Sequence, residues 1–193
     1  GTLIAFVANS LAATAALVPP TNRIYIRPLN QWDAIAIPGT EGGVNPFFSP
    51  DGRTLGFRSG SQLKTVPLAG GAPTVLTENV GTLNGYSWGA NGVIVFGRGF
   101  SEGLKSIRQT GGEVEAFTEL DPAANEISHR LTHFLPDGSA VLFTVVRYTS
   151  ITPDWKRAEV WVKSLATGER KRLLEDATDA RYAGSDVLTL ARQ

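Results

Sequence analysis

The chain has 193 residues, of which 42% are hydrophobic and 19% charged, a globular composition with enough length for one core or two small ones. Its 18 basic and 18 acidic residues give a net charge of zero, which argues against nucleic acid or an anionic membrane surface as the main partner. Cysteine is absent, so disulfides, thiolate nucleophiles and cysteine-based metal sites are excluded.

The chain begins at Gly1 and contains no methionine, so we interpret it as a processed product or a piece of a longer protein. Residues 3–18 form an apolar run that lacks a basic start and is too short to span a bilayer. We expect a strand over residues 3–8 and then a loop of small residues as far as Pro20, with a remnant of a targeting sequence as the alternative. No other segment is apolar enough to cross a membrane.

Three later segments resemble one another. Each has an aromatic residue, a turn that contains Asp-Gly or Asn-Gly, and a second apolar strand, with the turn glycines at Gly52, Gly92 and Gly138. These dipeptides favour tight hairpins because both central positions of the turn need positive φ. The longer interval, between the second and third glycines, carries an insertion over residues 148–155. A weaker fourth copy occupies residues 180–190.

A second hairpin follows each of the first three, so the repeating unit is four short strands in about 40 residues. That is the period and strand number of a β-propeller blade. Helical periodicity is nearly absent, and even the charged residues 158–174 alternate like strands on either side of a glycine turn.

The predicted fold class is therefore all-β, a β-propeller with about four visible four-stranded blades. We expect one propeller domain over residues 1–193, in which the chain closes a small ring or forms an arc of a larger one. An arc would expose strand edges and favour self-association. With strands named a to d from the axis outward, the expected parts are strands b–d of a first blade at 3–38, blades at 44–79, 83–119 and 130–176, and a partial blade at 179–192.

Several segments resemble the TolB-like, WD-repeat-like propeller family, and the match runs over residues 24–192. They are FFSPDGRTLGF, VPLAGGAPTVLT, YSWGANGVIVF, SHRLTHFLPDGSAVLFT and VWVKSLATGERKRLL. These segments closely resemble the six-bladed propellers attached to some bacterial serine/threonine kinases, although this chain is too short for six blades and has no kinase domain. It would then be a truncated member. The resemblance implies a scaffold that binds at the mouth of its channel, and a periplasmic or extracytoplasmic location.

One strand-like stretch contains both histidines, His129 and His133, together with Glu126 and Arg130. Even spacing on a strand places the histidines on one side of the sheet but roughly 13 Å apart, too far for one metal ion unless the strand bends. Glu126 and Arg130 are expected to point together. The resemblance places this stretch near the channel, where a binding or acid–base role competes with a favoured structural, hydrogen-bonded role.

Polar residues also lead into the other innermost strands, and with Arg181 they are expected to ring one end of the channel. Their carboxylate, amide and basic groups suit a polar ligand, with a Ca²⁺ ion as the alternative. No catalytic residue and no other cofactor is predicted. The predicted binding residues at the channel mouth are Glu41, Asn45, Asn84, Glu126, His129, Arg130 and Arg181.

Two short motifs suggest chemistry. Residues 85–89 match the G-x-S-x-G pattern of hydrolases, but a turn and a strand follow, so Ser87 is interpreted as a serine at a repeat position. Residues 97–103 are similar to a phosphate-binding loop but lack its Lys-Ser/Thr end and its helix, so a hairpin loop is favoured. The basic residues 170–172 are interpreted as a solvated outer edge.

The predicted function is a non-catalytic module that binds a protein, peptide or small molecule at the channel mouth and rim loops. The alternative is a lactonase-like propeller hydrolase with a channel-bound metal and His129 or Glu126 as base. A third interpretation is a structural role, in which open blade edges drive homo-oligomerisation. Trp155 is expected to be exposed for a partner, and Trp32 to pack within a blade. Nucleic acid and membrane insertion are not expected.

Overall fold

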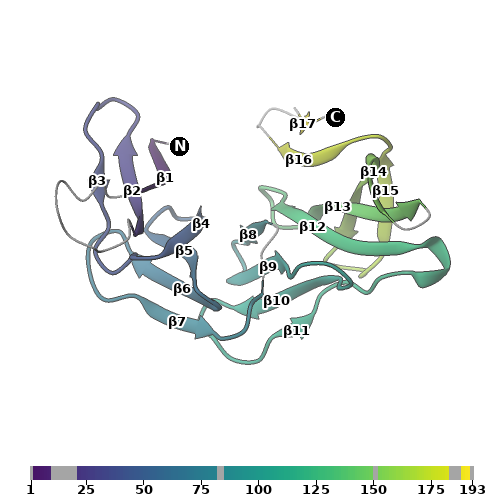
Figure 1. Cartoon of the computed structure of the whole chain (residues 1–193), viewed down its shortest axis with the longest axis horizontal. Coiled ribbons are helices and arrows are strands. Elements are labelled where there is room, and N and C mark those ends of the chain that lie inside the picture. Colours follow the sequence, from purple (N-terminus) through teal and green to yellow (C-terminus); the bar gives the residue numbers. More distant parts are fainter. Residues whose placement is uncertain (1, 10–20, 82–84, 150–151, 183–187, 192–193) are drawn as a thin grey trace. The chain divides into compact units, whose positions relative to one another are not determined.

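The computed structural model describes residues 2–9, 21–81, 85–149, 152–182 and 188–191, and within them the protein consists of β-strands and one short 3-10 helix (Figure 1). None of the described segments is a helix long and apolar enough to cross a membrane. The elements are β1 (Leu3–Asn9), β2 (Asn22–Pro28), β3 (Ile35–Ala36), β4 (Gly43–Phe48), β5 (Thr54–Ser59), β6 (Gln62–Pro67), β7 (Thr74–Thr77), β8 (Tyr86–Trp88), β9 (Val93–Gly97), β10 (Leu104–Arg108), β11 (Glu115–Ala116), η1 (Pro122–Ala124), β12 (Glu126–Phe134), β13 (Ala140–Thr149), β14 (Thr152–Ser164), β15 (Arg170–Leu174), β16 (Thr178–Tyr182) and β17 (Leu188–Ala191).

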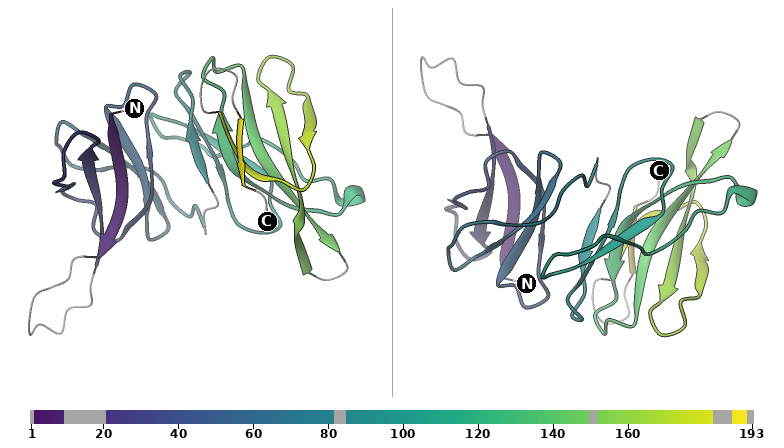
Figure 2. Two further views of the ribbon diagram at one scale, coloured as in Figure 1. Left: turned by 90° about the horizontal axis from the view of Figure 1, so that it is seen from above. Right: turned by 90° about the horizontal axis from the view of Figure 1, so that it is seen from below.

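Consecutive strands pair antiparallel, and in the described residues they form five sheets (Figure 2). A three-stranded sheet, β1–β3, comes first, three four-stranded sheets follow as β4–β7, β8–β11 and β12–β15, and β16 pairs with β17. This is the all-β, four-strand pattern that the sequence repeat predicts. The last four-stranded sheet begins at Glu126, before the residue 130 at which its blade was expected to start.

The chain forms two compact units, Gly1–Val80 and Gly81–Gln193. The expectation of a single domain over residues 1–193 stays a prediction. In the first unit, one face of β1–β3 packs against β4–β7, because alternate residues of β1 and β2 point to that side. The buried core of this unit is Ile24, Ile37, Leu55, Phe57 and Val66.

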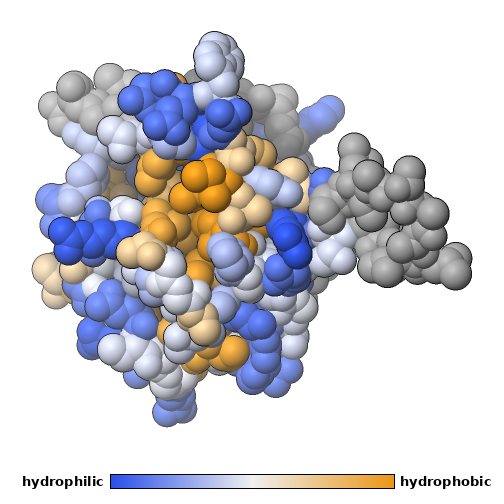
Figure 3. Space-filling view, turned by 90° about the vertical axis from the view of Figure 1, so that its left-hand side faces the viewer, coloured by the Kyte–Doolittle hydropathy of each residue, from blue (hydrophilic) through white to orange (hydrophobic). Residues whose placement is uncertain are grey.

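The opposite face of β1–β3 also carries apolar residues. Phe6 and Tyr25 are cross-strand partners on that face, and their rings stack with centroids 5.8 Å apart. Apolar side chains gather at the surface in Figure 3, and large exposed apolar residues of this unit include Ile4, Leu29 and Trp32. Trp32 is 93% exposed in the connection between β2 and β3, so its interpretation as a packing residue is wrong.

The second unit buries one cluster between the sheets β8–β11 and β12–β15. This cluster consists of Val95, Leu104, Phe134, Val141, Phe143 and Val145. A further cluster joins the other face of β12–β15 to β16 through Leu142, Val160, Ala177 and Ala180. The sheet β12–β15 is therefore covered on both faces, so its charged side chains must find partners inside the protein.

Strand β12 is irregular, and this irregularity decides where its polar residues point. Its pairing with β13 shifts between Arg130 and His133, where Leu131 has a φ of 56°. A β-bulge of this kind inverts the alternation of side chains. His129 pairs with Val145 of the first cluster, whereas His133 pairs with Leu142 of the second. The expectation that both histidines share one side of the sheet is therefore wrong.

Candidate functional site

The residues predicted for the channel mouth are divided between the two units. In the first unit, Glu41 forms an ion pair with Arg23 at 3.1 Å, and both side chains are nearly half exposed. Asn45 is exposed on β4 with a φ of 54°, at an irregularity in the pairing with β5. Asn84 lies outside the described residues.

The remaining predicted residues belong to the second unit. Glu126, His129 and Arg130 lie on β12, and Arg181 lies on β16, where its Nε donates to Asp179 Oδ1 at 2.7 Å. Glu126 and Arg130 were expected to point together, but Glu126 contacts His129, and Arg130, the next residue on the strand, points to the opposite side from His129. These residues of β12 therefore form two separate groups, with Glu126 and His129 on one face of the sheet and Arg130 on the other face.

His129 is fully buried between two hydrogen-bonding partners. Its Nε2 lies 3.1 Å from Glu126 Oε2, and its Nδ1 lies 2.7 Å from Thr118 Oγ1. Thr118 Oγ1 also accepts a hydrogen bond from the backbone N–H of Leu104 at 2.8 Å. The imidazole ring packs on Phe143 with ring centroids 5.1 Å apart, so both of its nitrogens are enclosed by protein.

The protonation states of this pair follow from their surroundings. Burial alone raises the pKa of Glu126, but the hydrogen bonds from His129 and Arg170 outweigh burial and lower that pKa to about 2. For His129, burial lowers the pKa and outweighs the opposite effect of Glu126. At neutral pH the pair therefore consists of an ionised carboxylate and a neutral imidazole.

Arginines surround two buried carboxylates on the same sheet. Arg170 Nη1 donates to Glu126 Oε2 at 2.9 Å, and Arg147 lies between Glu126 and Glu159, with nitrogen–oxygen distances of 3.5 and 2.5 Å. Arg172 Nη1 also donates to Glu159 at 2.9 Å. Burial raises the pKa of Glu159, but hydrogen bonds led by that from Arg147 outweigh burial and lower it.

Sequence reasoning missed most of this network. Residues 170–172 were interpreted as a solvated edge, but Arg170 reaches a carboxylate whose side chain is 1% exposed. The register of β14 and β15 could have indicated the network. Arg172 pairs with Trp161 on β14, and Glu159 lies two positions from Trp161, on the same face of the sheet. Charges that recur on one face of neighbouring strands indicate an internal ion-pair network.

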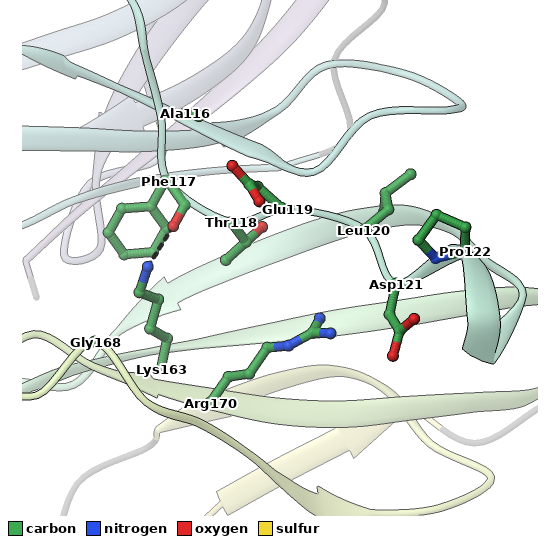
Figure 4. A pocket seen from close by; sticks show the side chains of 10 residues that line it. All are labelled: Ala116, Phe117, Thr118, Glu119, Leu120, Asp121, Pro122, Lys163, Gly168 and Arg170. Carbon is green, nitrogen blue, oxygen red and sulfur yellow. Dashed lines mark hydrogen bonds between the residues drawn. The ribbon is translucent and has the colours of Figure 1, made fainter.

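A groove of about 540 Å³ lies beside this network (Figure 4). The chain segment that joins β11 to β12 forms one wall, and Lys163 and Arg170 extend from β14 and β15 on the other. Lys163 Nζ donates to the backbone oxygen of Phe117 at 2.5 Å and lies over that residue's ring. The lining residues are Ala116, Phe117, Thr118, Glu119, Leu120, Asp121, Pro122, Lys163, Gly168 and Arg170.

Arg130 lies apart from both the network and the groove. Its guanidinium carbon is 4.8 Å from the ring centroid of Phe100 and 4.6 Å from that of Trp155. Its Nε donates to Ser128 Oγ at 3.0 Å. Trp155 is half-buried and packs on a small apolar cluster that includes Ile127. It is therefore less exposed than the sequence predicts.

The hydrolase-like motif has a structural explanation. Ser87 lies on β8, and a turn leads from there into β9 instead of into a helix. Its Oγ accepts a hydrogen bond from the backbone N–H of Phe134 at 2.8 Å.

Across the described ranges, no group of three or more His, Asp or Glu side chains is placed to hold a metal ion.

No family model matches the chain, and no curated protein matches it. Among solved structures, a TolB protein from Agrobacterium tumefaciens superimposes with a TM-score of 0.68 and 19% identity, covering 91% of this chain and 62% of that one. TolB from Acinetobacter baumannii gives 0.67 and 17%, covering 89% and 43%. Acylaminoacyl peptidase from Pyrococcus horikoshii gives 0.60 and 17%, covering 93% and 32%.

The chain thus spans less than two thirds of the length of each of these proteins. At such identities the similarity establishes the fold and does not carry over an activity. The resemblance to TolB-like propellers that the repeated segments suggest is confirmed at the level of the fold. Together, the antiparallel four-stranded sheets and these superpositions show that the chain has the β-propeller fold found in TolB.

Proposed function

We propose that this chain is a non-catalytic binding module whose groove between the β11–β12 connection and the β14–β15 turn holds an acidic peptide segment of a partner. The observation that carries this proposal is the groove itself. Its volume of about 540 Å³ falls within the range of ligand sites in proteins, and it lies entirely within the second unit.

The charges of the groove favour an acidic ligand. Lys163 forms no ion pair with a carboxylate of the described chain, and its ammonium is held by a backbone oxygen. The Asp121 carboxylate is engaged by the backbone N–H groups of Ala123 and Ala124. Glu119 is exposed and points away from Arg170 in Figure 4. Lys163 is therefore the cation of the groove that is available to a ligand carboxylate.

The surroundings of the buried pair argue against catalysis. A general base needs a nitrogen or oxygen that can reach the proton of a substrate. Both ring nitrogens of His129 are occupied by Thr118 and Glu126, and the side chain is 0% exposed. Glu126 in turn is held by His129 and Arg170. These contacts support a structural role for the pair and weaken the hydrolase alternative.

Fluorescence polarisation with a short labelled peptide of alternating Glu and Ala tests the proposal. The same peptide with Gln in place of Glu serves as the neutral probe. We expect the acidic peptide to bind more tightly and Lys163→Ala to weaken it about tenfold, the effect of losing one hydrogen bond to a charged group. Lys171→Ala, an exposed lysine of β15 outside the groove, is the matched control and should not change binding.

Equal binding of the two peptides, or equal effects of the two lysine variants, would contradict the proposal. Hydrolysis of p-nitrophenyl acetate by the chain, abolished in His129→Gln, would instead favour the hydrolase. Circular dichroism shows whether each variant is folded, so that unfolding is not mistaken for a specific loss of peptide binding or of hydrolysis.

A further inference from the structure

Arg130 is a buried cation whose charge has no opposite charge beside it. The residue is 5% exposed, and its Nη2 atom is buried without a hydrogen-bond partner among the described residues. Within that part of the chain it forms no ion pair, whereas Arg170 and Arg172 each pair with a glutamate, and arginine is seldom buried without such a partner. Burial alone lowers its pKa, with no contribution from a nearby charge.

The acidic residues near it in sequence are already engaged. Glu126, at the start of β12, binds His129 of the same strand and Arg170 of β15. Glu102 pairs with Lys105 at a nitrogen–oxygen distance of 3.6 Å. Among the described residues, no carboxylate forms an ion pair with Arg130. A buried guanidinium without an opposite charge lowers the stability of the folded protein unless a ligand supplies that charge.

The surroundings of Arg130 hold its guanidinium in a fixed orientation. The rings of Phe100 and Trp155 lie over it, and Ser128 Oγ binds Nε. Ser128 is fixed in turn because its Oγ donates to the backbone oxygen of Gly99 at 2.9 Å. Since Nε is engaged, the edge formed by Nη1 and Nη2 is the part of the guanidinium that remains for another group.

We call Arg130 with Phe100, Trp155 and Ser128 the clamp, and it lies near the protein surface. Phe100 is 56% exposed, on the bend that joins β9 to β10. The backbone beside it is anchored, since Ser101 N–H donates to the oxygen of Ile127 at 2.7 Å and Glu102 forms a parallel bridge with Ser128. The exposed Phe100 ring is therefore the part of this site that a ligand from solvent would meet first.

We propose that Arg130 is the receptor for a single carboxylate of a peptide ligand, whose adjoining apolar group packs on Phe100 and Trp155. Two parallel N–H···O hydrogen bonds from the Nη edge match the two oxygens of a carboxylate. A phosphate group brings nearly two negative charges and would find one cation here, so it is disfavoured. None of these residues lines the groove, so this site does not depend on the proposed function.

The test uses N-acetyl-phenylalanine, which presents a carboxylate like that of a peptide C-terminus, and its amide as the neutral probe. The α-amide of N-acetyl-glutamate represents an acidic side chain, and inorganic phosphate represents the competing anion. Two signals are followed on the full chain, the Nε–H resonance of Arg130 in protein labelled with ¹⁵N-arginine, and tryptophan fluorescence. We expect a saturable shift of both with one or both carboxylates, and at least tenfold weaker binding of the amide.

Variants assign the signal to the clamp. Arg130→Lys keeps the charge but lacks the fork, and should weaken binding about tenfold, whereas Arg108→Lys, an exposed arginine of β10, should leave it unchanged. Phe100→Ala removes a surface ring and remains testable even if Arg130→Lys fails to fold; it should weaken binding several-fold. Trp155→Phe should abolish the fluorescence change while the Arg130 resonance still shifts.

Three results would overturn the proposal. The first is equal binding of the acid and the amide, which would mean that the carboxylate is not recognised. The second is tighter binding of phosphate than of either carboxylate. The third is an Arg130 resonance that does not respond to any of the probes. Because this resonance belongs to Arg130 alone, failure of peptide binding in the groove would not be confused with failure here.

Discussion

Thr118 Oγ1 lies 2.7 Å from His129 Nδ1, and the groups around the two atoms determine which of them donates the hydrogen bond. Glu126 is ionised at neutral pH because its pKa is about 2, so its Oε2 can only accept, and His129 Nε2 must carry the proton between them. A neutral imidazole then has a bare Nδ1. Thr118 therefore donates to His129, while its oxygen accepts from Leu104.

We predict that His129 is neutral and protonated at Nε2 at pH 7. In ¹⁵N spectra of histidine-labelled protein, Nδ1 should show the shift of an unprotonated nitrogen and Nε2 that of a protonated one. Thr118→Val keeps the shape but removes the donor, and should lower stability by about 1–3 kcal/mol because buried polar groups lose their partner. A spectrum with the proton on Nδ1 would contradict the assignment.

Stability should fall as the pH is lowered. The folded pKa of His129 lies below its ordinary value of 6.5, so the unfolded chain takes up a proton first and acid favours unfolding from about pH 6.5 downward. Burial also lowers the pKa of His133, so His133 contributes to the loss of stability over the same pH range. The folded pKa of Glu126 is about 2 against an ordinary 4.5, so its share is present above pH 4.5 and is lost between there and about pH 2.

Urea midpoints measured from pH 8 to pH 3 check this dependence. His129→Gln should remove part of the loss between pH 6.5 and 5, while part of the loss below pH 4.5 remains because Arg170 still lowers the pKa of Glu126. Greater stability on acidification through pH 6 would show that the histidines are protonated more readily in the folded state than in the unfolded chain.

The repeat and its sheets are predictable from sequence because their signals are local. Alternating apolar residues and turn glycines such as Gly52 and Gly138 mark each hairpin, and the four-stranded sheets follow from them. Glu126 and His129 can also be singled out, because this stretch brings both histidines of the chain together with a carboxylate and an arginine. What they bind is not local, because Arg170 comes from a strand far along the chain.

The bulge in β12 could not be predicted for a related reason. Nothing in the residues around Leu131 marks a positive φ, which elsewhere in the described chain falls on glycine, asparagine, aspartate or serine. The bulge results from pairing with β13, and it moves His133 to the other face of the sheet. The arrangement of Arg130 depends in the same way on a loop and on Trp155, which reach it from different parts of the chain.

Replacement of Glu126 by Gln should destabilise the protein far more than a similar change at the surface. The variant removes the anion that pairs with Arg170 and leaves Arg147 with Glu159 alone, at a partly buried site, which costs about 3 kcal/mol. Glu175→Gln is the control, because Glu175 is 63% exposed in its pair with Arg172 and should cost less than about 1 kcal/mol. Similar urea midpoints for the two variants would show that the buried network contributes little.

Gly103→Ala should disturb both the core and the groove. A Cβ at Gly103 would overlap the backbone oxygen of Thr118, so the segment that forms one wall of the groove would have to move. We expect a loss of about 1–3 kcal/mol, weaker binding of the acidic peptide and a changed Nδ1 resonance of His129. Gly112→Ala is the control, since its Cβ meets open space and only its φ of 116° is strained, at a cost of about 1–2 kcal/mol. If both variants bind the peptide like the wild type, the Thr118 segment is not the wall that the ligand contacts.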